Sequence, residues 1–265
     1  MVLRTQAQTT PGHARLAWFR LPALVREPLL LLGRVVRGIL HNPPPRDRVL
    51  TQMHNVGIRS LVFISITLGF LGLILVYQGC VQTLKVLPDL SGVGQVFIYA
   101  MWRSFGPTIT ALMLATRVGA GIAAEIGSMT VTDQIEAMKV ANADPVEYIL
   151  GPRFIACVVM TPVLWVVGAM VGIAAGYFMG HLHFGISTRA FLDLSSTHVS
   201  DVVVGYIKAQ TYGVVIPILS AESGFRAQGG SEGVGWATTR AVVNSSFAVI
   251  TLDFLISTSA FLLGY

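Results

Sequence analysis

The sequence predicts an all-α polytopic membrane protein with five transmembrane helices, and three observations support this fold class. Apolar residues make up 53% of the 265 positions and charged residues only 12%, about half the share of charge in a soluble domain. The mean hydropathy is +0.68. Continuous apolar runs reach about 20 residues, the length that a helix needs to cross roughly 30 Å of hydrocarbon. Because these runs do not alternate with polar residues, a β-barrel is not expected.

Residues 1–50 are predicted to form a cytoplasmic N-terminus and a basic amphipathic helix lying in the membrane interface. Residues 1–14 are polar and are expected to be disordered, and residues 15–40 mix Leu and Val with five arginines, as interfacial helices do. A signal peptide is the alternative, but Arg26 and Glu27 interrupt its apolar core and no A-x-A site follows. Three prolines, beginning at Pro43, end the helix.

The basic residues are concentrated at this end of the chain, which predicts the topology. Excess Lys and Arg mark cytoplasmic segments, so the N-terminus is expected in the cytoplasm and, with five spans, the C-terminus on the outer side. The net charge of +5 does not predict nucleic-acid binding, because the cations do not cover one soluble face. Nine of the eighteen Lys and Arg residues precede or open the first apolar run: Arg4, Arg15, Arg20, Arg26, Arg34, Arg37, Arg46, Arg48 and Arg59.

Residues 51–265 form the predicted five-span domain. Gly106-Pro107 and Thr161-Pro162 predict kinks in the second and third spans, and Asp144-Pro145 predicts a helix start with Asp as N-cap. Outer segments are expected at 85–94 and 181–200, and an inner loop at 222–235. The predicted spans are 56–77, 95–124, 152–180, 201–219 and 241–263.

Four glycines in the third span, at every fourth position from Gly168 to Gly180, line one helix face. Such a small-xxx-small pattern predicts close approach of a neighbouring helix backbone. The general enrichment of glycine in membrane helices is the other explanation.

A polar insert at residues 116–139, TRVGAGIAAEIGSMTVTDQIEAMK, separates two apolar runs. Thr130-x-x-Asp133 resembles a capping box and predicts a short helix over about residues 130–140. A helix this short is not stable alone, so it is either a solvated loop or a coupling helix that docks on a cytosolic ATPase. The candidate coupling residues are Glu125, Asp133, Gln134, Glu136 and Met138.

The chain is not expected to be an enzyme. Its three lysines lie outside any G-x-x-x-x-G-K-[ST] phosphate loop, so ATP and magnesium would be bound by a separate subunit and no cofactor is predicted here. The H-E-x-x-H motif does not occur. His181-x-His183 could suggest a metal site, but no carboxylate or Cys completes one nearby, so no metal is expected. Cys80 and Cys157 are expected to pack among apolar side chains.

Two ionisable residues, Lys208 and Asp253, lie in the middle of predicted spans. An ionisable group at that depth normally faces a cavity or pairs. One interpretation is a structural ion pair. In another, Lys208 and Arg103 attract a lipid phosphate while Asp253 holds Lys208. Tyr77, Gln78 and Phe105 complete the candidate lipid-binding residues, and interfacial anchoring is their alternative role.

Several ordered motifs give the chain a resemblance to a known family. They are Phe105-Gly106-Pro107, Arg117-x-Gly-x-Gly, Ala124-Glu125-Ile126-Gly127, Asp133-Gln134-Ile135-Glu136-Ala137-Met138, Asp144-Pro145, Pro152-Arg153-Phe154 and the run from Gly233 to Val243. Together, over Asn55 to the C-terminus, they resemble the MlaE/YrbE family, the permease subunits of ABC transporters that work with MCE proteins on phospholipids or other lipids.

The resemblance implies a five-span homodimer with lipid in a cavity between the two permeases. Its implied partners are two cytosolic ATPases, which the coupling helix contacts, a hexameric MCE ring on the outer side and an accessory STAS-domain protein. One departure matters: Ser104 follows Arg103, where the family often has Glu, so Arg103 is expected either to be unpaired or to hold a lipid phosphate. An ion-coupled secondary transporter that uses Lys208 and Asp253 is the alternative function; it typically has internal repeats, and none is evident.

Overall fold

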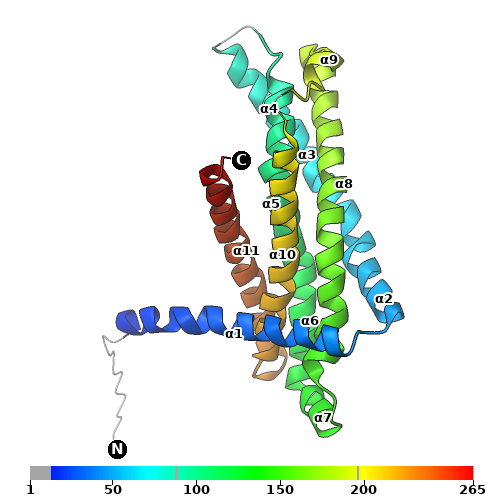
Figure 1. Ribbon diagram of the computed structural model, residues 1–265, viewed down its shortest axis with the longest axis vertical. Coiled ribbons are helices and arrows are strands. Elements are labelled where there is room, and N and C mark those ends of the chain that lie inside the picture. The colour runs from blue at the N-terminus through cyan, green and yellow to red at the C-terminus, as the bar shows by residue number, and fades with distance from the viewer. Residues whose placement is uncertain (1–12, 87–88, 196, 265) are drawn as a thin grey trace, which may run out of the picture.

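The computed structural model describes residues 13–86, 89–195 and 197–264, and within these ranges every regular element is a helix (Figure 1). The predicted all-α class is therefore confirmed. The elements in chain order are α1 (His13–His41), α2 (Arg46–Val56), α3 (Ile58–Leu84), α4 (Val93–Ala100), η1 (Met101–Phe105), α5 (Gly106–Leu114), η2 (Ala115–Gly119), α6 (Ala120–Val131), α7 (Gln134–Val140), η3 (Val146–Leu150), α8 (Gly151–Phe184), α9 (Thr188–Phe191), α10 (Val199–Phe225) and α11 (Gly230–Leu262).

Five stretches of the described chain are long and apolar enough to cross a membrane, as the sequence predicts. The first three are longer than expected because consecutive helices, including the π-helical turns η1, η2 and η3, join end to end. The last two are single helices that are longer than expected. The α7 helix lies beyond one end of the bundle and α9 lies at the other (Figure 1), and we call these the α7 end and the α9 end. The stretches are Arg46–Leu84, Val93–Val131, Val146–Phe184, Val199–Phe225 and Gly230–Leu262.

The predicted N-terminal helix lies crosswise to the spans near the α7 end (Figure 1), the placement expected of a helix in the interface plane. It contacts η3, α8 and α10. Gly38 permits the contact with η3, because a Cβ there would lie 2.5 Å from Cγ of Glu147. The helix begins at His13, so it includes the last two residues of the segment 1–14 that is predicted to be disordered. Residues 1–12 of that segment lie outside the described chain, and the expected domain boundary at residue 50 falls inside α2.

Two predicted boundaries near the α7 end are wrong. The expected inner loop at 222–235 is mostly helical, because α10 continues to Phe225 and α11 begins at Gly230. Gly229 and Gly230 have φ values of +89° and +71°, which glycine adopts without strain, so the chain reverses in a few residues. The predicted capping box does not form either. α6 continues to Val131, and the Thr130 hydroxyl donates to the backbone oxygens of Ile126 and Gly224.

The N-cap of α7 is Asp133, in the left-handed conformation with φ of +57° and without a side-chain capping bond. The predicted start at Asp144 is confirmed, since its carboxylate accepts a hydrogen bond from the Val146 N–H at 2.9 Å. The second span contains the π-helical turn η1 directly before Gly106-Pro107, where the sequence predicts a kink. At the α9 end, α8 extends to Phe184 and α9 follows within the expected outer segment.

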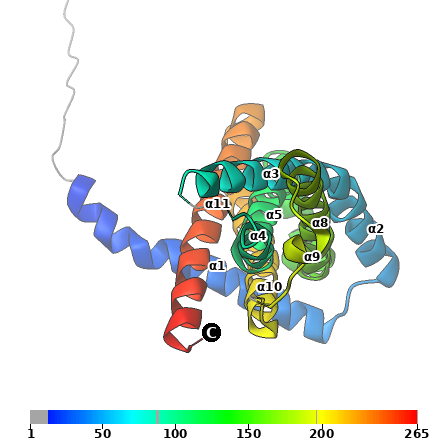
Figure 2. The same ribbon diagram turned by 90° about the horizontal axis from the view of Figure 1, so that it is seen from above.

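The bundle encloses the second span: seen from above, α4 and α5 lie among α3, α8, α10 and α11 (Figure 2). Its tightest contact joins α3 and α8, whose glycines meet backbone to backbone. A Cβ on Gly72 would lie 2.1 Å from the oxygen of Gly172. Gly168 and Gly176 of α8 likewise receive Leu68 of α3 and Phe97 of α4. The predicted close approach along the glycine face of the third span is therefore confirmed.

Gly72→Ala is expected to lower the free energy of unfolding by about 1–3 kcal/mol, because the new methyl group meets backbone atoms that cannot rotate away. Gly69→Ala, one turn earlier on α3, is the matched control, since its Cβ would lie 3.6 Å from Val171 in ordinary contact. Thermal unfolding of the purified protein in detergent measures both. Equal stability of the two variants would contradict the backbone contact.

Candidate functional site

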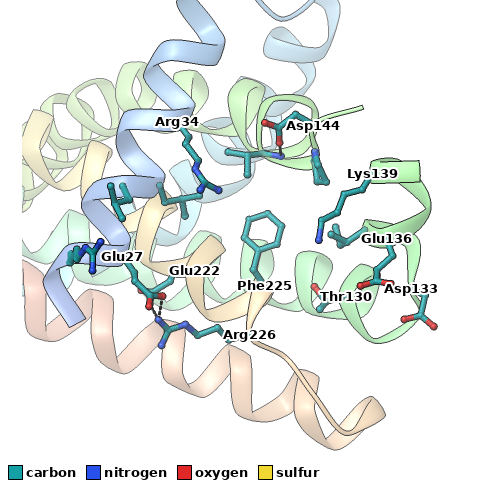
Figure 3. Close-up of a pocket in the computed structure, with 16 residues that line it drawn as sticks. Glu27, Arg34, Thr130, Asp133, Glu136, Lys139, Asp144, Glu222, Phe225 and Arg226 are labelled. Atoms are coloured by element: carbon teal, nitrogen blue, oxygen red, sulfur yellow. Dashed lines mark hydrogen bonds and ion pairs between the residues drawn. The ribbon is translucent and has the colours of Figure 1, made fainter. Parts of the chain in front are cut away.

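The α7 helix presents its acidic residues to solvent. Ile135 is only 7% exposed and Met138 packs against the apolar core, so the apolar side of the helix holds it to the bundle. Asp133, Gln134 and Glu136 are exposed, and Figure 3 shows Asp133 pointing away from the bundle and Glu136 directed toward Thr130. Of the candidate coupling residues near α7, Met138 therefore packs against the bundle, and the other three remain accessible to solvent.

Glu125, the remaining candidate coupling residue, lies on α6 and forms an ion pair with Arg153 at 2.5 Å. The Arg153 side chain is 8% exposed, whereas that of Glu125 is 59% exposed. This contact ties α6 to the first turn of α8 and places Glu125 on a different helix from the α7 carboxylates. Glu125 and Arg153 are 28 residues apart in the sequence, so the fold is what brings them into contact.

The two ionisable residues in the middle of the bundle pair with each other. Nζ of Lys208 lies 2.8 Å from Oδ1 of Asp253, and Lys208 is completely buried. The hydroxyls of Thr108 and Tyr212 donate to the same carboxylate oxygen at 2.8 and 2.9 Å. The structural ion pair is therefore present, and it joins α5, α10 and α11 through a single acceptor. Thr108 and Tyr212 could not be predicted from the sequence, because their roles depend on three helices meeting.

Arg103, on η1, pairs with the carboxylate of Asp201 in the first turn of α10, so the expectation that it could lack a partner is wrong. Asp201 is 3% exposed and also accepts the N–H of His198 at the start of α10. The guanidinium additionally lies 5.6 Å from the Tyr99 ring. Asp201 thus supplies the carboxylate that Ser104 lacks. The sequence did offer one signal for this pair: Asp201 is a carboxylate at the start of a predicted span, at the membrane depth of Arg103.

The remaining lipid candidates are exposed but lie apart from the Lys208–Asp253 pair. Tyr77 is 41% exposed, and its ring contacts Phe184 and His183 at the end of α8. Gln78 beside it is exposed, and Phe105 on η1 is 44% exposed. Among the described residues, no hydrogen bond or ring contact joins these three to the pair. The three exposed candidates are therefore separate from the buried pair.

The histidines at the α9 end contact aromatic and backbone groups. The ring of His181 stacks on Tyr177 at 5.4 Å and bonds the backbone oxygen of Ile186. His183 packs edge-on against Phe184. These contacts explain the histidines as packing residues in the described chain.

Comparisons with known proteins agree with this architecture. The family model for Permease MlaE matches residues 49–259. A probable ABC transporter permease protein of Rickettsia conorii is 34% identical over 224 residues, which cover 84% of this chain and 86% of that protein. The intermembrane phospholipid transport system permease protein MlaE of Haemophilus influenzae is 33% identical over 256 residues, covering 94% and 95%.

A plant protein also matches: the chloroplastic protein TRIGALACTOSYLDIACYLGLYCEROL 1 of Arabidopsis thaliana is 32% identical over 234 residues, which cover 88% of this chain and 67% of that protein. The family match covers most or all of each of the five membrane-crossing stretches and the whole α7 helix. This chain belongs to the MlaE permease family.

Proposed function

We propose that this chain is the permease subunit of an ABC transporter that moves phospholipid or a related lipid between the inner membrane and an MCE protein partner. A separate cytosolic ATPase drives the movement and binds the ATP and magnesium, so the chain is a non-catalytic subunit of the translocase. The names of its relatives support this proposal, since one is an intermembrane phospholipid transport permease and another a probable ABC transporter permease.

The observation that carries the proposal is the α7 helix. It is a short helix outside the membrane-crossing stretches, with a buried apolar side and exposed Asp133, Gln134 and Glu136. A seven-residue helix gains its stability from packing rather than from its own hydrogen bonds, so the bundle holds it in one position. A rigid, charged projection of this kind suits docking into a groove of an ATPase.

This role sets the topology and the assembly. The α7 end faces the cytoplasm of a bacterial inner membrane, with the N-terminus on that side and the C-terminus in the periplasm. Two copies form a homodimer. The helix α11 offers a surface for this contact, because only 17% of its most apolar part is buried within the chain. A hexameric MCE ring binds at the α9 end, and an accessory STAS-domain protein joins the cytosolic ATPases.

The lipid contacts divide between exposed and buried residues. Tyr77, Gln78 and Phe105 are exposed and contact acyl chains, and Arg103, with a side chain that is 14% exposed, attracts the headgroup phosphate. Lys208 is completely buried, and Asp253, whose side chain is 26% exposed, holds it in place. The alternative, an ion-coupled secondary transporter, would use this same pair. Because Asp253 already accepts bonds from Thr108, Tyr212 and Lys208, the pair suits a structural role better.

Glu136→Lys is expected to abolish ATP-driven lipid transport while the permease remains folded and inserted. The substitution reverses a charge on the exposed face of α7, and like charges across an interface suppress association. Co-purification of the ATPase and lipid transfer in proteoliposomes measure the effect. Asp47→Lys, an exposed carboxylate on α2 near the same end, is the matched control. Normal ATPase assembly and transport by Glu136→Lys would refute the coupling role.

Lys208→Met is expected to destabilise the fold by about 3 kcal/mol, because it leaves a charged carboxylate at membrane depth without its cation. The double variant Lys208→Met/Asp253→Asn removes both charges, and it should recover most of the stability and retain lipid transport. Thermal unfolding and cross-linking of labelled phospholipid measure the two effects. A double variant that is stable but transports nothing would instead favour the ion-coupled alternative, and unchanged lipid capture and transport in Lys208→Ala would exclude a lipid role for Lys208.

A further inference from the structure

A cavity of about 990 Å³ lies at the α7 end, apart from the polar contacts in the middle of the bundle. Its walls are α1, α7, the start of η3 and the end of α10, so it separates the crosswise N-terminal helix from the coupling helix (Figure 3). Phe225 stands between the two sides. Asp133 and Glu136, proposed above to contact the ATPase, lie in its walls, and the proposed lipid contacts lie elsewhere.

Two cations point into the cavity from opposite walls. Figure 3 shows Arg34 extending from α1 and Lys139 extending from α7 toward the same space. Neither forms an ion pair with any residue of the described chain. Both are exposed to solvent. Two converging cations without a carboxylate partner provide the charge that a phosphate group needs.

The acidic residues of the cavity are engaged elsewhere or point elsewhere. Glu27 and Glu222 both bind the guanidinium of Arg226. The carboxylate of Asp144 caps the N–H of Val146.

The two α7 acids also leave the centre of the cavity free. Asp133 points away from it, and Glu136 lies at its edge beside Thr130 (Figure 3). Arg26 is the remaining cation in the walls. The centre of the cavity is therefore more positive than the composition of its walls implies.

The apolar part of the walls favours a lipid over a free anion. Leu30, 53% exposed, and Leu31 come from α1, and Val146 comes from the start of η3. An interfacial helix holds its apolar side at the boundary between headgroups and acyl chains. A phospholipid at this boundary presents its phosphate at the depth of Arg34 and its upper acyl chains at the depth of the leucines.

We propose that this cavity binds the phosphate-bearing headgroup of an anionic phospholipid from the leaflet at the α7 end. Arg34 and Lys139 contact the phosphate from opposite sides, and the bound lipid braces α1 against α7. The site is distinct from the transported lipid, and it requires only that α1 lie in the membrane interface. Failure of transport in other variants would therefore leave it unaffected.

The test uses the full chain in nanodiscs that contain equal amounts of phosphatidylglycerol and phosphatidylcholine, with a photo-cross-linking residue in place of Leu31. Mass spectrometry measures the ratio of the two cross-linked lipids. The anionic lipid is expected in excess of its share of the bilayer. Arg34→Gln and Lys139→Gln should each lower the ratio about fivefold. This factor corresponds to the binding free energy of about 1 kcal/mol that one Lys or Arg contributes near an anionic lipid surface. The double variant should return it to the bilayer ratio.

Three controls keep the outcome decisive. Arg37→Gln removes an exposed cation of α1 that lies outside the cavity walls, and it should leave the ratio unchanged, as should the conservative Arg34→Lys. Size-exclusion profiles show whether each variant is folded. A ratio equal to that of the bilayer in the unmodified cavity, or an equal loss in Arg37→Gln, would overturn the proposal. If inorganic phosphate returns the ratio to that of the bilayer, the site binds free anions. If cross-links form to protein alone, the site binds a protein partner. Either result overturns the lipid assignment.

Discussion

Hydrocarbon supplies no hydrogen-bond partner, so each polar group within the membrane must find its partner inside the protein. The mid-bundle contacts follow from this constraint. Asp253 forms an ion pair with Lys208 and accepts hydrogen bonds from Thr108 and Tyr212. Arg103 forms an ion pair with Asp201. The contacts of Lys208, Tyr212 and Asp201 each link α10 to another span, whereas Thr108 links α5 to α11. The helix α10 therefore takes part in both groups of polar contacts.

The same constraint shapes the packing of the apolar helices. Lipid tails are as apolar as leucine, so burial of apolar surface does little to drive helices together, and close van der Waals contact must replace it. The α3–α8 contact meets this need with Gly72 against Gly172 and with Leu68 fitted over Gly168. Several hydroxyls within these helices bond the preceding turn, as Thr161 of α8 does to the backbone oxygen of Cys157 at 2.7 Å. A tight, inflexible pair of helices results on the side of the bundle away from α11.

The parts of this structure that could be predicted from the sequence depend on local composition. Continuous apolar runs predict the five spans, the arginines predict α1, and Asp144-Pro145 predicts the start of the third span. Contacts that depend on three-dimensional approach could not be predicted in the same way. Arg103 and Asp201 are 98 residues apart, and only the packing of η1 against α10 brings them together.

Local competition explains the boundaries that were wrong. In a Thr-x-x-Asp pattern the threonine can be the N-cap of a new helix. It can also lie inside a helix, where its hydroxyl bonds a backbone oxygen of the previous turn. Tertiary packing of α6 against α10 and α11 favoured the second, and α6 continued past Thr130. The coupling residues on α7 were predicted as a set because they share one short helix. Glu125 was separated from them because its position depends on Arg153, at the start of another span.

The connection of α7 to the middle of the bundle bears on how ATP hydrolysis reaches the lipid. α7 is held by α6, and α6 packs along both α10 and α11, the two helices that carry Lys208 and Asp253. A displacement of α7 by an ATPase is therefore transmitted through rigid helices rather than through a loop. The pair itself adds resistance, because separating α10 from α11 would expose a buried ammonium group to hydrocarbon. Movement of α10 and α11 as one unit avoids that cost. We therefore expect α3 and α8, joined by their glycines, to remain fixed while α6, α10 and α11 move together against them.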